Sequence, residues 1–322
     1  MARILTGIQS SGKPHLGNIL GAINPSINLS RTKGNESLFF IADLHSLINI
    51  KDPNLLQENT FSVASAWLAM GFDFKNHFFY RQSKITEVCE LTWYLNCFTP
   101  FPMLSNSHSF KDKSENLSEI NSGLFTYPVL MASDILLYDA EIVPVGKDQK
   151  QHLEITRDIA KSFNHQYGDT FIIPKSKIDE NVMTIKGIDG RKMSKTYNNT
   201  IDIFADEKLL KKQVMSIVTD SKGIDDKKDP SNCNIYNLFK VIATEKESSE
   251  MREKYIRGGY GYGQAKTDLL STIMDNFKNE RKSYFDYMKN KDYLNSILEI
   301  GENKAKGIAT KVLDRVKIKL GF

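Results

Sequence analysis

The chain has 322 residues, of which 40% are hydrophobic and 25% are charged, and its net charge is only +4. This composition is typical of a folded globular protein and excludes a disordered or collagen-like chain. No apolar stretch approaches the length of a membrane span, and the first residues show no signal-peptide pattern. We therefore expect a cytoplasmic protein with no membrane partner.

Charge and cysteine content leave the function open. The net charge is compatible with a nucleic-acid partner but is too small to require one. The cysteines Cys89, Cys97 and Cys233 are widely spaced and form no Cys-x-x-Cys pair. We therefore expect neither a disulfide framework nor a metal-binding cysteine site.

The first half of the chain alternates short apolar runs with longer amphipathic stretches, which predicts β-α-β units around a buried parallel sheet. The clearest helix begins at Asp52 and Pro53, an N-cap carboxylate followed by proline, and ends at Gly71. The apolar runs that predict strands are 3–8, 38–42, 78–80, 141–145 and 171–173. The expected fold class is α/β.

Polar residues from about 105 to 123 predict an exposed insertion in the first half. The second half of the chain is organised differently. Beyond about residue 200 the strand signals fade, and we predict a mostly helical domain at 200–322 that follows a catalytic domain at 1–199. Its last helix is expected to pack back on the first domain, and 219–234 to be a flexible connection. The helical patterns cover 209–218, 235–244, 265–287 and 292–320.

A possible phosphate-binding segment follows the first predicted strand. Residues 7–13 have the spacing of a P-loop, but the next residue is Pro14, where that motif needs a Ser or Thr for magnesium. The P-loop interpretation therefore fails. Because parallel strands present ligands at their carboxyl ends, an anion site is still expected beside the helix that begins near His15.

Three residues of that helix could serve a nucleotide. His15 and Asn18 lie three residues apart on one face and can offer hydrogen bonds to a phosphate or a ribose. Gly17 has no Cβ, so a nucleotide could approach the backbone closely. From these residues alone, a His15 that only caps or packs the helix is an equally good interpretation.

A second candidate lies in the pentapeptide Lys192-Met193-Ser194-Lys195-Thr196, which sits beside Gly187 and Gly190. Two ammonium groups on a mobile loop can reach the phosphates of ATP while charge moves onto the departing pyrophosphate. Two lysines alone would indicate only a solvated loop. The intact pentapeptide is far more specific.

The order and spacing of these two segments resemble the class I aminoacyl-tRNA synthetases. The run from Val143 to His152, which reads Val-Pro-Val-Gly-Lys-Asp-Gln-Lys-Gln-His, is similar to the bacterial tryptophanyl branch of that family. The segments 218–221 and 259–263 also resemble the family, so the similarity spans nearly the whole chain. It implies a Rossmann-like catalytic domain, a helical domain that binds the tRNA anticodon, and a homodimer.

The resemblance also implies a reaction. L-tryptophan would attack the α-phosphate of ATP to form tryptophanyl-adenylate and pyrophosphate, and the amino acid would then pass to tRNA(Trp). We expect Mg²⁺ to arrive on the ATP phosphates, because no cluster of Asp and Glu predicts a dedicated metal site. The alternatives are a tyrosyl-tRNA synthetase and a synthetase-like protein that binds tRNA or tryptophan without catalysis.

Site residues follow from the resemblance, position by position. Catalysis is expected from His15, Asn18, Lys192, Ser194 and Lys195. The ATP site is expected at Gln9, Ser10, Ser11, Gly17, Asn18, Lys113, Gly146, Lys147, Asp148, Val182, Met183, Lys192, Met193, Ser194, Lys195 and Thr196. The tryptophan site is expected at Leu5, Gly7, Gln9, His45, Tyr127, Met131, Asp134, Val143, Val145 and Gln149.

Within the tryptophan site, the family match implies that Asp134 accepts a hydrogen bond from the indole N–H. It also implies that Gln149 and Tyr127 hold the ammonium group of the substrate. On pattern alone, Asp134 could equally bond to local backbone or to Tyr138. A surface role suits Lys113 equally well. For Met131, Val143 and Val145, which would form the apolar wall around the indole, core packing is the stronger interpretation. Asp148 also resembles a helix N-cap.

Overall fold

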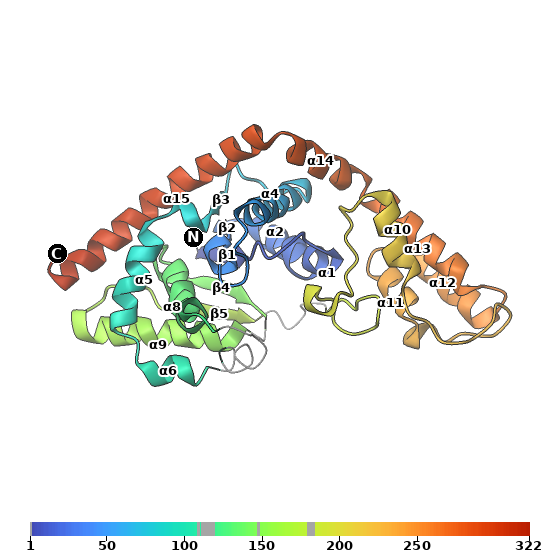
Figure 1. Cartoon of the computed structure of the whole chain (residues 1–322), viewed down its shortest axis with the longest axis horizontal. Coiled ribbons are helices and arrows are strands. Elements are labelled where there is room, and N and C mark those ends of the chain that lie inside the picture. The colour runs from blue at the N-terminus through green and yellow to red at the C-terminus, as the bar shows by residue number, and fades with distance from the viewer. Residues whose placement is uncertain (1, 108–109, 111–119, 147–148, 179–183) are drawn as a thin grey trace.

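Figure 1 presents a computed structural model of the chain, which describes residues 2–107, 110, 120–146, 149–178 and 184–322. Within these residues, one five-stranded sheet has the order β3-β2-β1-β4-β5, and all of its strand pairs are parallel. The predicted α/β class is confirmed. The strands are β1 (Ala2–Ile8), β2 (Asn35–Ile41), β3 (Phe78–Arg81), β4 (Ile142–Val145) and β5 (Lys175–Ile178).

The fifth strand was predicted in the wrong place. Residues 171–173 form no strand, and β5 starts at Lys175, which pairs with Ile142. The side chain of Asn164 explains the difference, because it accepts from the N–H of Phe171 and donates to its C=O, both at 2.8 Å. A residue whose backbone groups are already bonded in this way cannot join a ladder.

The helices of the first half cover both faces of the sheet. The predicted helix at 53–71 is confirmed as α4, and Asp52 caps it by accepting from the N–H of Asn54 and Leu55. The helices are α1 (Leu16–Asn18), the π-helical turn η1 (Ile19–Ile23), α2 (Asn24–Ser30), α3 (Asp43–Ser46), α4 (Pro53–Ala69), the 3-10 turn η2 (Gln82–Lys84), α5 (Glu87–Cys97), α6 (Phe101–Ser105), α8 (Ser122–Leu136) and α9 (Lys150–Tyr167). Most of the predicted insertion at 105–123 lies outside the described residues.

The second half is helical within the described residues. The pattern at 265–287 was predicted as one helix and is wrong in that respect, because the chain breaks at Phe277, whose φ of −108° and ψ of 17° are not helical. A helix at 245–257 was not predicted. The elements are η4 (Lys195–Tyr197), α10 (Glu207–Met215), η5 (Pro230–Asn232), α11 (Asn234–Lys240), α12 (Glu245–Arg257), α13 (Tyr262–Asn276), α14 (Lys278–Lys289) and α15 (Lys291–Leu320).

The connection at 219–234 is irregular but folds around one buried lysine. Lys228 is 3% exposed, and its Nζ donates to the carbonyls of Gly223, Ile224 and Asp226. Three carbonyl partners satisfy all the donors of an ammonium group, which is how a buried charge is tolerated.

Two apolar clusters lie on the opposite faces of the sheet. Phe39 and Phe79 belong to a cluster that also includes α4 and residues of the second half, whereas Phe40 and Tyr80 face the cluster beneath α5, α8 and α9. The first cluster joins residues on both sides of position 200, from Leu16 to Leu298. The two halves of the chain therefore share one core.

The long helix α15 lies along the sheet at β3 (Figure 1). Its residues enter both apolar clusters, and at Gly301 the helix comes so close that an added Cβ would lie 1.9 Å from the carbonyl oxygen of Phe79. Arg81 makes an ion pair with Glu302 at 2.6 Å and a hydrogen bond to Asn295. The edge strand β3 is thus covered by the last helix. None of the helices described is both long and apolar enough to span a membrane.

Candidate active site

A cavity of about 890 Å³ opens at the carboxyl ends of β1 and β4. Helices α1 and α2 with the π-helical turn between them form one wall, and α8 forms another. The position follows from the parallel sheet, because strand ends and helix N-termini meet at this edge. All ten residues predicted for tryptophan line it: Leu5, Gly7, Gln9, His45, Tyr127, Met131, Asp134, Val143, Val145 and Gln149.

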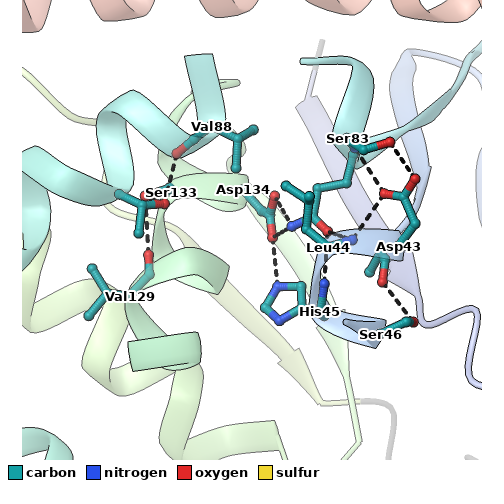
Figure 2. Close-up of polar contacts among 12 residues, drawn as sticks. Asp43, Leu44, His45, Ser46, Ser83, Val88, Val129, Ser133 and Asp134 are labelled. Atoms are coloured by element: carbon teal, nitrogen blue, oxygen red, sulfur yellow. Dashed lines mark hydrogen bonds and ion pairs between the residues drawn. The ribbon is translucent and has the colours of Figure 1, made fainter. Parts of the chain in front are cut away.

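Asp134 is the buried acidic residue of this cavity. It is 2% exposed, and its carboxylate accepts from Nε2 of His45 at 3.0 Å and from Nε2 of Gln82 at 2.8 Å to each oxygen. Figure 2 shows the bond between Asp134 and His45. Burial raises the pKa of Asp134, and the bonds from His45 and Gln82 oppose that rise. Neither local backbone nor Tyr138 supplies these bonds, so the local interpretation of Asp134 is wrong.

A second polar chain crosses the other side of the cavity. The hydroxyl of Tyr127 lies 2.8 Å from Nε2 of His152, and Nδ1 of His152 lies 2.9 Å from Oε1 of Gln149. His152 is 2% exposed. It therefore links the two residues that were predicted to hold the substrate ammonium.

A smaller cavity of about 260 Å³ lies next to the first, between the start of α1 and the pentapeptide 192–196. Gln9, Asn18 and Ile8 line both cavities, so the two spaces meet at the end of β1. The residues predicted for ATP or catalysis that line the smaller cavity are Gln9, Ser11, His15, Asn18, Ser194, Lys195 and Thr196.

His15 and Asn18 form a reciprocal cap at the start of α1. The N–H of Asn18 donates to Nδ1 of His15 at 3.3 Å, and the N–H of His15 donates to Oδ1 of Asn18 at 3.2 Å. Capping therefore does occur, and it leaves Nε2 of His15 outside the reciprocal pair. Burial, together with the nearby charge of Lys195, lowers the pKa of His15 to about 4. The imidazole is therefore neutral at physiological pH.

Asn199 organises the loop that carries the two lysines. Its side chain accepts from the N–H of Ser194 at 2.8 Å and donates to Asp189 at 2.7 Å and to the carbonyl of Lys192 at 3.1 Å. Asn199 is 1% exposed and fills the space that a Cβ at Gly187 would occupy. One buried amide thus ties both ends of the loop together.

The lysines of the loop face different spaces. Lys192 lines the large cavity and Lys195 the smaller one. Burial lowers the pKa of Lys195 to about 8, which Asp202 partly offsets. The Nζ of Lys195 lies beside Gly12, whose φ of +136° favours glycine. Each of the two adjoining cavities is thus lined by one lysine of the loop, an arrangement suited to a polyphosphate.

Comparison with known proteins identifies the family. Residues 1–278 match the family described as tRNA synthetases class I (W and Y). A tryptophan–tRNA ligase of Campylobacter jejuni is 43% identical over 320 residues, which are 99% of this chain and 100% of that protein. The chain belongs to the class I tRNA synthetases. A tryptophan–tRNA ligase of Fusobacterium nucleatum is 44% identical in an alignment that covers 100% of this synthetase and 98% of that one.

Solved structures of tryptophanyl-tRNA synthetases have the same fold as this chain. A tryptophanyl-tRNA synthetase from Campylobacter jejuni, complexed with ADP and tryptophan, has a TM-score of 0.96 and 43% identity, over 99% of this synthetase and 100% of that chain. One from Mycoplasma pneumoniae has a TM-score of 0.79 at 28% identity, over 100% and 98% of the two chains. An archaeal tyrosyl-tRNA synthetase, at 16% identity and a TM-score of 0.63, shares the fold.

Some residues predicted for the ATP site of the synthetase line neither cavity. Ser10 is fully buried and bonds to Ser46. The space next to Gly17 is occupied by His15 and Met193 rather than left open, and the N–H of Gly17 donates to the sulfur of Met193. In this structure Gly17 lets the start of α1 touch the pentapeptide 192–196.

Two other residues predicted for the ATP site, Gly146 and Lys192, line the large cavity. The predictions for Lys113, Lys147, Asp148, Val182 and Met183 lie outside the described residues.

Three residues of the synthetase site were missed by sequence reasoning: Gln82, His152 and Asn199. Gln82 follows β3 directly, so its place at the carboxyl edge was a signal that could have found it. His152 ends the run 143–152 that resembles the family, which was a signal, but its bond to Tyr127 depends on how α8 and α9 pack. Asn199 carried no such signal, because its partners are set by how the loop at 189–199 folds. Within the described residues, no group of three His, Cys, Asp or Glu side chains could hold a metal ion.

Proposed function

We propose that the two adjoining cavities activate L-tryptophan with ATP and then pass it to tRNA(Trp). The chain acts as a tryptophan–tRNA ligase, the activity of relatives that match it over its full length at 43% and 44% identity. The observation that carries the site is the junction at Gln9 and Asn18, which line both cavities. The tryptophan carboxylate and the α-phosphate of ATP would meet there.

The large cavity suits tryptophan. Its walls at Met131, Val143 and Val145 are apolar, and Asp134 offers an acceptor for the indole N–H. A carboxylate has about four lone-pair positions, and three donor contacts from protein leave room for one from a ligand. Tyr127 and Gln149 would hold the ammonium group at the opposite side.

ATP would lie across the junction as its magnesium complex, which enters as substrate. Lys192 and Lys195 would neutralise charge that builds on the departing pyrophosphate, and the neutral His15 would donate a hydrogen bond rather than supply charge. Catalysis then rests on position and electrostatics, with no covalent enzyme intermediate.

The remaining features of the enzyme are also proposed from the family. We place the catalytic domain at 1–199 and the tRNA anticodon-binding domain at 200–322. We expect a homodimer, a cytoplasmic location and tRNA(Trp) as the macromolecular partner. These proposals rest on the resemblance and on the helical character of the described second half.

Tryptophan-dependent exchange between ATP and pyrophosphate tests the site without tRNA. We expect exchange with tryptophan and background exchange with tyrosine or with no amino acid. Exchange with tyrosine would overturn the assignment of the cavity. No exchange from folded protein supplied with Mg²⁺ would favour a synthetase-like protein that binds without catalysis.

A further inference from the structure

Gln82 is a fully buried polar side chain at the edge of the amino-acid cavity. It opens the turn η2 directly after β3, at the sheet edge where β1 and β2 also end. Its amide contacts two separate elements, the carboxylate of Asp134 on α8 and the first backbone N–H groups of α3. One side chain therefore joins α8 to the helix that carries His45.

The bonds of Gln82 can have only one polarity. Oε1 accepts from the N–H of Leu44 at 3.2 Å and of His45 at 3.4 Å. A backbone N–H can only donate, so the amide oxygen must face α3. The amide NH₂ must then face Asp134, to which it donates at 2.8 Å. The fold thus forces a donor, never an acceptor, against this carboxylate.

We infer that Gln82 is a positioning residue that holds Asp134 as an oriented, ionised acceptor, and so determines the preference for a substrate with a ring N–H. The inference rests on the proposed function, in which Asp134 meets the indole. Gln82 contacts the carboxylate and does not line the cavity, so it acts through Asp134. Charge-assisted hydrogen bonds to both oxygens fix the direction of the remaining lone pair.

Gln82→Glu is the sharpest perturbation, because it keeps the shape and reverses the polarity toward Asp134. One oxygen of the introduced carboxylate can still accept from α3, but the other faces Asp134. At low pH a single proton shared by the two carboxyls restores one hydrogen bond. As pH rises and both carboxyl groups ionise, they repel each other. The carboxylate of Asp134 then rotates away from the orientation in which it would accept from the indole N–H.

The experiment measures KM and kcat for tryptophan in ATP–pyrophosphate exchange between pH 6 and 9 for the wild type and Gln82→Glu. We expect the variant to lose tryptophan affinity progressively as pH rises, with KM increased roughly tenfold or more at the upper end and a smaller change in kcat. A residue that only stabilised the fold would lower the melting temperature without a KM that depends on pH.

Substrate choice provides the second readout. An analogue with benzothiophene in place of indole keeps the shape of tryptophan but lacks the N–H. Wild type should disfavour it by roughly a hundredfold or more, because Asp134 would be left without its partner. Gln82→Met, which fills the space but donates nothing, should reduce that preference at least tenfold.

Ser83→Ala is the matched control. Ser83 lies next in sequence and ties the same turn to α3, but it bonds to Asp43 and not to Asp134 (Figure 2). Its KM should follow the wild-type pH profile. A Gln82→Glu variant with wild-type KM at every pH and wild-type discrimination would overturn the inference while the proposed function stood. Absence of tryptophan-dependent exchange in the wild type would instead refute the proposed function.

Discussion

Replacing Gly301 by alanine should push the last helix away from the strand β3 and destabilise the protein. Gly301 faces the backbone of Phe79, and a new Cβ would lie 1.9 Å from its carbonyl oxygen and 2.6 Å from its carbonyl carbon. These atoms belong to a strand that is bonded to β2, so they cannot rotate away as a side chain would. The helix must move by about 1.5 Å before the pair reaches normal contact distance.

The expected cost follows from two opposing effects. Alanine is better than glycine in a helix by about 1 kcal/mol. Overpacking against a rigid neighbour costs about 1–3 kcal/mol. The movement also strains the buried ion pair of Arg81 with Glu302, next to the site of substitution, and charge-assisted bonds of this kind contribute about 1.5–3 kcal/mol. We expect Gly301→Ala to lower the free energy of unfolding by about 2–3 kcal/mol overall.

Gly307→Ala provides the control on the same helix. No atom lies within 4 Å of a Cβ built there, so only the gain in helix propensity remains, and the free energy of unfolding should rise by about 0.5–1 kcal/mol. Urea unfolding followed by circular dichroism would measure both variants. If the two substitutions changed stability in the same direction, the close contact between α15 and β3 would not be what makes alanine destabilising at position 301.

Three further predictions concern single side chains. Asn199→Ala should reduce kcat for exchange roughly tenfold to a hundredfold, with little effect on KM for tryptophan, because the loop loses the amide that holds its two ends. Wild-type kcat/KM for ATP should fall as pH rises above about 8, where Lys195 loses its proton, and Lys195→Arg should abolish that fall; an unchanged profile would contradict this role. Lys228→Met should make the segment 219–234 more sensitive to limited proteolysis than Lys222→Met, because only Lys228 is buried among three carbonyls; equal cleavage would contradict the structural role of Lys228.

The sheet could be predicted because four of its strands are apolar on both faces and bounded by polar residues. The failure at 171–173 has a local cause. Phe171, Ile172 and Ile173 have the composition of a strand, but Asn164 on α9 had already bonded the backbone of Phe171. A side chain seven residues earlier thus prevented the pairing, and no periodicity in the run itself could indicate that.

The residues that line the cavity could be predicted from the sequence, whereas the buried amides that position them could not. Residues such as Asp134 and Tyr127 stood out through the family resemblance and through polar groups set among apolar ones. Gln82 and Asn199 are amides in polar stretches that read as solvent-exposed turns. Gln82 is buried against Asp134, which lies far along the chain, and that contact exists only once the fold is formed. The partners of Asn199 lie within its own loop, and no residue pattern there indicates which way the loop folds.

The cover that α15 places over β3 also affects how the protein is made. Of the described elements, α15 is the last to leave the ribosome, yet it shields an edge strand that is complete more than two hundred residues earlier. Until then β3 offers an unpaired row of backbone groups, which in other proteins is a template for aggregation. The nascent chain must therefore carry an open sheet edge through most of its synthesis.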